Sequence, residues 1–204
     1  MKLIISSRNL HKIQELRHML KPYSKLDVFS LLDFPNYSPP AEGKDSLKEN
    51  AVSKAIAAAE QLHQWVIADD TGLVVPALQG EPGVHSARYA REGASDLDNR
   101  RKLLKEMENI LDPEDRHGYF ECWLAVASPS ASLEKVVQGC CEGTILFQEK
   151  GGKGFGYDTL FRKLGYHQSF AELKDEVKNK ISHRRKAIDK LASLLQYLHN
   201  SSTE

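Results

Sequence analysis

Residues 67–75 read Ile-Ala-Asp-Asp-Thr-Gly-Leu-Val-Val and place two adjacent carboxylates between two apolar runs. Consecutive residues of a β-strand point to opposite faces, so Asp69 and Asp70 cannot both be buried in the same core. We expect a strand over 65–68 to end in a turn that contains both aspartates, followed by a strand over 73–78. A carboxylate at such a strand end is suited to bind Mg2+ together with a phosphate. An ordinary Asp-Asp turn, with the following glycine supplying unusual backbone angles, is the alternative.

Length and composition indicate an ordinary globular protein. The chain has 204 residues, of which 41% are hydrophobic and 27% are charged, and this length fits one domain over 1–204 with two lobes around a central cleft. Lys and Arg together number 28, as do Asp and Glu, so the formal net charge is zero. Proteins that bind nucleic acid through phosphate contacts usually carry a basic excess. We therefore expect no stable nucleic-acid partner.

The number of cysteines and the length of the apolar segments indicate where in the cell the protein is expected. Cys122, Cys140 and Cys141 are too few for a disulfide scaffold, and their odd number argues against complete pairing. The apolar run over 1–5 is too short for a signal peptide, and no uncharged stretch is long enough to cross a bilayer. We expect a cytoplasmic protein that is not associated with a membrane.

The opening of the chain has the features of a phosphate-binding turn. A short apolar strand over 3–5 leads into a polar turn with Ser7 and Asn9, and then into a helix that carries Lys12. Unpaired N–H groups and the positive end of the dipole lie at a helix N-terminus, where anions bind. An ordinary capped helix start is an equally good interpretation.

A second strand is expected over 26–30, followed by a proline-rich loop that ends near Glu42. This acidic side chain on a loop is available to a metal ion. Ser46 and Glu49 form a capping-box pattern, which predicts a helix that runs to about Gln64.

The middle of the chain predicts a helix and two paired strands. A long loop over 80–89 contains two glycines and a proline, and loops of this kind are often functional. Ser95 resembles a helix cap, and the apolar spacing after it predicts a helix to about Leu111. Alternation predicts a strand over 118–128, and a return strand is expected over 135–148.

Two later stretches carry candidate ligand-binding residues. Residues 151–158 hold four glycines, which allow close approach of a ligand, and Phe155 and Tyr157 offer rings for stacking on a base. A glycine-rich loop with incidental aromatic residues is the alternative.

The Ser169-x-x-Glu172 pattern predicts a cap for a helix that carries Lys178. The densest basic cluster of the chain, residues 178–186, follows at an expected break between two helices. Charged runs on helices are usually solvated surface, but side chains at a helix break can point into a cleft. A final amphipathic helix is expected after the cluster.

Together these segments resemble the inosine/xanthosine triphosphate pyrophosphatases, which act on non-canonical purine nucleotides. The matching residues follow the family's order and span nearly the whole chain: Ser7-x-Asn9-x-x-Lys12, Glu49-Asn50-Ala51, Ala68-Asp69-Asp70-Thr71-Gly72-Leu73, Pro82-Gly83-x-x-Ser86-Ala87-Arg88-Tyr89, Gly154-Phe155-Gly156-Tyr157-Asp158 and Lys178-x-x-x-Ser182-His183-Arg184. The combination is specific, although no single segment is.

The resemblance implies an α/β fold, with an elongated, twisted mixed β-sheet flanked by helices and two lobes around a substrate cleft. It implies a Mg2+-dependent hydrolase that converts ITP, dITP or XTP to the monophosphate and pyrophosphate. It also implies a homodimer.

The resemblance further implies a role for each matching residue. These are the triphosphate loop Ser7, Arg8, Asn9 and Lys12; the metal carboxylates Glu42 and Asp70, with Asp69 as a further candidate; Asp70 as proton acceptor; and Thr71, Phe155, Gly156, Tyr157, Asp158, Lys178, His183 and Arg184 as substrate contacts. The chain departs from the family pattern at Ser7, Arg8 and Thr159.

Two other functions remain open from the sequence. A related pyrophosphatase could act on other modified nucleotides. A non-catalytic nucleotide- or nucleic-acid-binding module could use the basic cluster and the aromatic loop, but the acidic pair and the neutral net charge argue against it.

Overall fold

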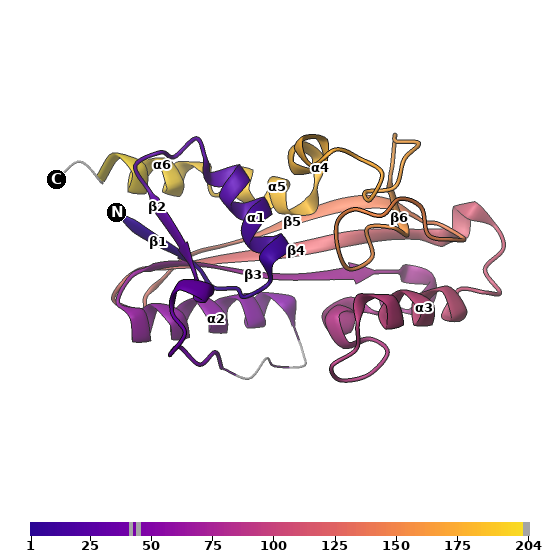
Figure 1. Ribbon diagram of the computed structural model, residues 1–204, viewed down its shortest axis with the longest axis horizontal. Helices are drawn as coiled ribbons and strands as arrows, with labels where there is room; N and C mark the ends of the chain where they lie inside the picture. Colours follow the sequence, from indigo (N-terminus) through magenta and orange to yellow (C-terminus); the bar gives the residue numbers. More distant parts are fainter. Residues whose placement is uncertain (41–42, 44–45, 202–204) are drawn as a thin grey trace. The chain divides into compact units, whose positions relative to one another are not determined.

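The computed structural model describes residues 1–40, 43 and 46–201 of the 204-residue chain. Its described strands form one six-stranded sheet in the order β2-β1-β3-β4-β5-β6 (Figure 1). The strands are β1 (Lys2–Ile5), β2 (Asp27–Ser30), β3 (Trp65–Val74), β4 (His117–Ala127), β5 (Leu133–Ile145) and β6 (Phe161–Lys163). The α-helices are α1 (Leu10–Leu20), α2 (Leu47–Leu62), α3 (Asp96–Glu106), α4 (Asp175–Ile181), α5 (His183–Lys190) and α6 (Ala192–Asn200).

The sheet is mixed. Strand β1 is parallel to both β2 and β3, with Leu3 opposite Val28 and Trp65. Strand β5 is antiparallel to β6. The predicted α/β class, with a mixed sheet and flanking helices, is confirmed. Among the described helices, none combines the length and the apolar character that a membrane span requires.

The chain divides into two compact units. Unit 1 comprises residues 1–70, 122–139 and 184–204, and unit 2 comprises residues 71–121 and 140–183. The prediction of a single domain over 1–204 is not tested by this division and stays a prediction.

Unit 1 is a sheet with a separate core on each face. The alternation of strand side chains explains this directly, because Leu3 and Ile5 pack into one core and Ile4 into the other. On β3, Ile67 lies on the face covered by α1, α5 and α6, whereas Val66 and Ala68 face α2. Figure 1 shows α2 on one side of β1 and β3 and α1 on the other.

Helix α2 packs against its face of the sheet through small side chains. Ala51, Ala55, Ala58 and Ala59 are all fully buried at helical spacing. Because alanine adds little bulk, the helix backbone can approach the sheet closely. Ser46 caps this helix by accepting the Glu49 N–H, so the predicted helix start is confirmed.

Unit 2 has a single core that is rich in aromatic residues. Phe120 and Phe161 pack edge to face with ring centroids 4.7 Å apart, and Phe170 stacks on Phe120 at 6.1 Å. Helix α3 begins at a full capping box formed by Ser95 and Asp98, as predicted. It ends at Glu106, earlier than the sequence suggested.

The turn expected at the two aspartates is wrong. Strand β3 continues without a break from Trp65 to Val74, so Asp69, Asp70 and Thr71 are all strand residues. The strand expected over 73–78 is instead the end of β3, followed by a 3₁₀ turn at Pro76–Leu78. The aspartates interrupt the apolar pattern but not the strand, because tertiary partners described below satisfy both carboxylates.

The helix that carries Lys178 is present, but the start predicted for it at Ser169 is wrong. The Ser169 N–H donates to Glu172 Oε2 at 2.7 Å, but these residues close a local turn. Lys174 has an extended backbone with φ −70° and ψ 145°, and α4 begins only at Asp175. The predicted helix break before His183 is confirmed, because Ser182 is extended between α4 and α5.

Candidate active site

The two aspartates of β3 lie on opposite faces of the sheet. Asp69 has the parity of Ile67 and points to the face covered by α1 and α5, whereas Asp70 has the parity of Ala68 and points to α2. Adjacent residues therefore belong to two different side-chain networks.

Asp69 lies at the centre of a buried ion-pair network. Its side chain has no exposed surface, and its Oδ1 is 2.5 Å from Lys12 Nζ. Its Oδ2 accepts hydrogen bonds from Arg184 Nε at 2.8 Å and from the Cys122 thiol at 3.2 Å. Arg184, also with no exposed surface, forms a second ion pair with Glu15 of α1. One carboxylate thus joins β3 to helices α1 and α5.

The charged groups of this network stabilise the ionised forms of one another. Burial by itself would raise the pKa of Asp69, but the positive charges of Arg184 and Lys12 outweigh it and hold that pKa well below its usual range. Burial would likewise lower the pKa of Arg184, but Asp69 and Glu15 raise it well above its usual value. Removal of one partner would leave an uncompensated buried charge.

Asp70 has fewer partners and remains in part accessible. Lys54 Nζ lies 2.7 Å from its Oδ1, and the Asn50 amide donates to its Oδ2 at 3.1 Å. Both partners come from α2, one turn apart. Lys54 also donates to the Asp69 carbonyl at 3.0 Å. The side chain of Asp70 retains 11% of its surface, in contrast to none for Asp69.

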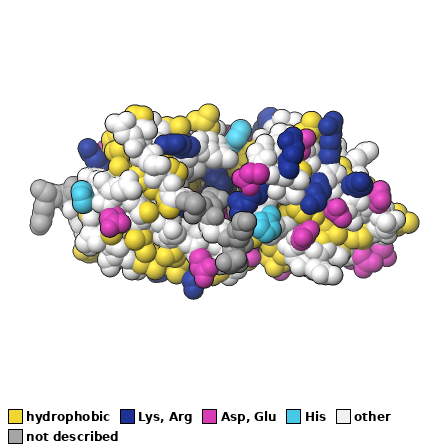
Figure 2. All heavy atoms as spheres, turned by 90° about the horizontal axis from the view of Figure 1, so that it is seen from below, with side chains coloured by type: hydrophobic (Ala, Val, Ile, Leu, Met, Phe, Trp, Pro, Cys, Tyr) yellow, Lys and Arg dark blue, Asp and Glu magenta, His cyan; other side chains and the backbone are white. Residues whose placement is uncertain are grey.

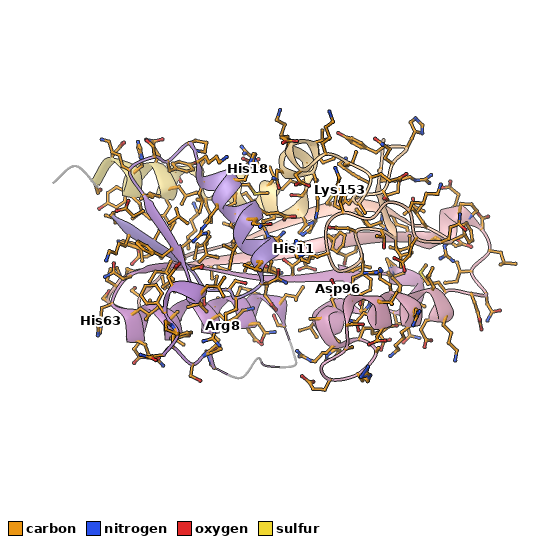
Figure 3. All side chains as sticks on the ribbon, viewed as in Figure 1. Arg8, His11, His18, His63, Asp96 and Lys153 are labelled. Carbon is orange, nitrogen blue, oxygen red and sulfur yellow. The ribbon has the colours of Figure 1, made fainter. Side chains whose placement is uncertain are left out.

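The loop that opens α1 already uses several of its donors internally. Asn9 Oδ1 accepts the N–H groups of His11 and Lys12, and Ser7 Oγ accepts the N–H of Asn9. Arg8 donates to the Tyr37 carbonyl at 2.6 Å. Asn9 therefore caps α1, as an ordinary helix start requires, and the phosphate-binding role of the loop stays a prediction. Figure 3 labels His11 at the start of α1.

A second cluster lies in unit 2 around the glycine-rich loop. Asp158 Oδ2 accepts Lys178 Nζ at 2.6 Å and the Phe155 N–H at 2.9 Å. The Lys178 ammonium also lies 5.0 Å from the centroid of the Phe155 ring. Lys178 and Asp158 are 6% and 4% exposed as side chains, so this is a buried, charge-assisted pair.

Two further predicted residues belong to the interior of unit 2. Tyr157 donates its hydroxyl to the Ser86 carbonyl at 2.9 Å, and burial raises its pKa. The His183 ring stacks on Phe120 with centroids 4.7 Å apart and planes 25° apart. Thr71 is half-buried on β3.

Three comparisons with known proteins indicate the family. The model of the Ham1 family matches residues 3–194. The dITP/XTP pyrophosphatase of Protochlamydia amoebophila is 50% identical over 98% of this chain and 100% of its own length, and that of Chlamydia caviae is 52% identical over 97% and 96%. The chain belongs to the Ham1 family.

Solved structures of the Ham1 family agree with this assignment. A HAM1 protein from Coxiella burnetii has a TM-score of 0.85 and 32% identity, covering 97% of this chain and 99% of its own. The Staphylococcus aureus Ham1 protein has a TM-score of 0.82 and 37% identity, covering 96% and 98%. The family resemblance stated from the sequence is confirmed.

The structure brings some predicted residues of this Ham1-family chain together and leaves others apart. Within unit 1 it joins Lys12, Asp69 and Arg184 directly, and it places Asp70 on the other face of the strand. Within unit 2 it joins Phe155, Asp158 and Lys178. Glu42 lies outside the described residues. Among the described residues no group of three or more His, Cys, Asp or Glu side chains is placed to hold a metal ion.

Sequence reasoning gave no role to three residues of the Asp69 and Asp70 networks. Lys54, Asn50 and Glu15 contact the central charges, and of these only Asn50 lies in a segment that the family resemblance had singled out. Asn50 and Lys54 are four residues apart and so share one face of α2. The four-residue spacing of Asn50 and Lys54, beside the buried alanines of α2, was the sequence signal that could have identified them.

Proposed function

We propose that this chain is a nucleoside triphosphate pyrophosphatase that hydrolyses the non-canonical purine nucleotides ITP, dITP and XTP to the monophosphate and pyrophosphate. The observation that carries the proposal is the set of relatives named dITP/XTP pyrophosphatase, about half identical over nearly the whole length of both chains. The Ham1-family match over residues 3–194 supports the same activity.

The charges around β3 suit phosphate chemistry once a metal ion is added. Lys12, Lys54 and Arg184 are balanced by the carboxylates Glu15, Asp69 and Asp70 within the same contacts. A triphosphate would add negative charge that this neutral set does not compensate. Phosphoryl-transfer enzymes meet the same need with divalent cations.

Mg2+ dependence is therefore part of the proposal, with Asp70 as the principal ligand. Mg2+ is usually held by one or two carboxylates together with phosphate oxygens and water. Asp70 is partly accessible, whereas Asp69 is fully buried and its oxygens are engaged by Lys12, Arg184 and Cys122. These contacts favour a structural role for Asp69, and Glu42 is kept as the second carboxylate. When bound, Mg2+ would neutralise phosphate charge and lower the pKa of a bound water.

Asp70 is also the proposed proton acceptor. Its carboxylate is oriented by Lys54 and Asn50 and keeps 11% of its side-chain surface. A general base positioned in this way contributes about 100-fold to 10,000-fold to the rate. Lys12 and Lys54 would bind phosphate oxygens, and Ser7, Arg8, Asn9 and Thr71 are retained as further substrate contacts.

For the base, the proposal relies on Phe155, Gly156, Tyr157, Asp158, Lys178 and His183. An oxygen at C6 distinguishes hypoxanthine and xanthine from adenine, and a site lined by donors rejects an amino group there because its own donors would be left unpaired. The guanidinium of Arg184 is occupied by Asp69 and Glu15, which favours a positioning role for it.

Two finer parts of the proposal concern the cell and the assembly. None of the three cysteines forms a disulfide bond, which supports a reducing, cytoplasmic compartment. We also propose a homodimer, to be tested by light scattering coupled to size-exclusion chromatography. A monomer at micromolar concentration would contradict it.

The decisive experiment is incubation of the purified chain with ITP, dITP, XTP, GTP and ATP, with pyrophosphate and phosphate assayed separately. We expect pyrophosphate from the first three, little turnover of GTP and ATP, and loss of turnover in EDTA that Mg2+ restores. Intact nucleotides in the presence of Mg2+ would refute the function, and undiminished turnover in EDTA would refute the metal dependence.

A further inference from the structure

Helix α3 binds both backbone polar groups of Gly156, the residue after Phe155. The Gly156 N–H donates to Asp96 Oδ2 at 2.6 Å, and the Gly156 carbonyl accepts Arg100 Nη1 at 2.9 Å. Asp96 and Arg100 are four residues apart and so lie on one face of the helix. Figure 3 labels Asp96, the first residue of α3.

The backbone at this point needs such support. Gly156 has φ +59° and Gly154 has φ +76°, both in the left-handed region that glycine adopts without strain. A glycine segment loses much conformational entropy when it is ordered, about 1–2 kcal/mol for each residue backbone. Two hydrogen bonds from one rigid helix offset part of that loss.

A second pair of contacts extends the support beyond the loop. Arg100 Nε donates to Glu149 Oε2 at 2.8 Å, and the same oxygen accepts the Thr159 hydroxyl at 2.8 Å. The side chain of Arg100 is only 16% exposed, so its guanidinium is held in place rather than solvated. Residues on both sides of the loop are thereby connected to α3.

The other side of the loop is attached to the interior of unit 2. Asp158 binds the Phe155 N–H and Lys178, and Tyr157 binds the Ser86 carbonyl. Phe155 itself remains half-buried. The backbone on both sides of Phe155 is therefore fixed, and its half-buried ring lies 5.0 Å from the Lys178 ammonium.

We propose that Asp96 and Arg100 are positioning residues that hold residues 155–158 in the conformation that contacts the purine base. This inference rests on the proposed function, because it assigns to α3 the control of base recognition at that site. Asp96 and Arg100 bind the backbone of the loop and not a group assigned to the chemical step, so their loss should weaken base binding without altering that step. A loss of binding common to ground and transition states raises KM and leaves kcat unchanged.

The kinetic test compares Arg100→Ala with Arg101→Ala, which removes a neighbouring exposed arginine of the same helix. For Arg100→Ala we expect KM for ITP to rise about tenfold, the equivalent of one good hydrogen bond to a charged group, with kcat within about twofold. The preference for ITP over ATP, measured as the ratio of kcat/KM values, should fall. Arg101→Ala should match the wild type in all three quantities.

A second measurement follows the loop itself and does not depend on activity. Hydrogen exchange of a peptide covering 153–158 should be faster in Arg100→Ala and Asp96→Ala than in the wild type and in Arg101→Ala. Asp96→Asn keeps an acceptor oxygen and should restore most of the protection. A thermal melt of each variant separates loss of the loop contacts from loss of the fold.

The outcomes are distinct. If the wild type hydrolyses ITP but Arg100→Ala changes neither KM nor the preference for ITP, the positioning role is refuted and the proposed function stands. Unchanged hydrogen exchange in both alanine variants refutes it as well, whatever the kinetics. If the wild type leaves ITP intact, the proposed function fails, and faster exchange would still establish that α3 orders the loop but not that the loop serves a base.

Discussion

Asp69 and Asp70 are consecutive residues on opposite faces of β3, and they differ in the exposure of their side chains and in the groups that bind them. Asp69 has no exposed surface and is bound by Lys12, Arg184 and the Cys122 thiol. Asp70 keeps part of its surface and is bound by Lys54 and Asn50. The first face joins β3 to two helices, and the second holds a carboxylate that is bound by one helix and keeps 11% of its side-chain surface.

Under the proposed function, this difference assigns a stabilising role to Asp69 and a chemical role to Asp70. Both oxygens of Asp69 are engaged by cations and its side chain has no exposed surface, whereas Asp70 is held by one helix and keeps 11% of its side-chain surface. The proposal therefore predicts that substitutions at the two positions fail in different ways, and the following experiments test this from the largest expected effect to the smallest.

Asp69→Asn should lower the free energy of unfolding by about 3–5 kcal/mol, because it leaves Arg184 buried beside a neutral side chain. Urea denaturation measures this directly. Arg184→Met should be destabilising by a similar amount, and the double variant should lose clearly less than the sum of the two. Additive losses would show that the pair is not coupled.

Asp70→Asn should reduce turnover of ITP at least a hundredfold, about 2.7 kcal/mol of transition-state stabilisation. It should change the free energy of unfolding by no more than about 1.5 kcal/mol, because the amide oxygen can still accept from Lys54 and neither side chain of this pair is fully buried. Pyrophosphate release and urea denaturation on the same preparation give both quantities. Near-normal turnover would remove Asp70 from the mechanism.

Lys54→Ala should reduce kcat/KM for ITP about tenfold, since it removes the cation that orients Asp70 and that we assign to phosphate binding. The matched control is Lys48→Ala, an exposed lysine on the same helix, which should behave as the wild type. Equal kinetics for the two variants would contradict the role given to Lys54.

The free energy of unfolding should fall at low pH in part because Asp69 becomes protonated. Its pKa in the folded chain is well below the ordinary value, so its contribution is complete above about pH 4, where the unfolded chain ionises, and is lost as the pH falls further. Between about pH 4 and pH 3 the wild type should lose up to about 1 kcal/mol more than Asp69→Asn. Parallel curves for the two proteins would argue against the buried ion pair.

Local pattern predicted the regular elements of this chain well. The caps at Ser46 and Ser95 mark helix starts because a short polar side chain satisfies the first backbone N–H groups, an effect contained within four residues. The Ser169–Glu172 pair shows that a capping pattern alone does not predict a helix, because the hydrogen bond from the Ser169 N–H to Glu172 closes an isolated turn. The turn expected at Asp69 and Asp70 failed for a related reason: carboxylates disfavour a strand only when they lack partners.

The sequence by itself determined the family, the alternation that places Asp69 and Asp70 on opposite faces, and the residue types needed for phosphate chemistry. Those features follow from strand periodicity and from side-chain chemistry, which act locally. Only the tertiary structure decided which aspartate side chain has no exposed surface, that Lys54 binds Asp70, and that α3 binds Gly156. These depend on contacts between residues up to 115 positions apart, as from Asp69 to Arg184, and no local pattern encodes which distant cation will meet a given carboxylate.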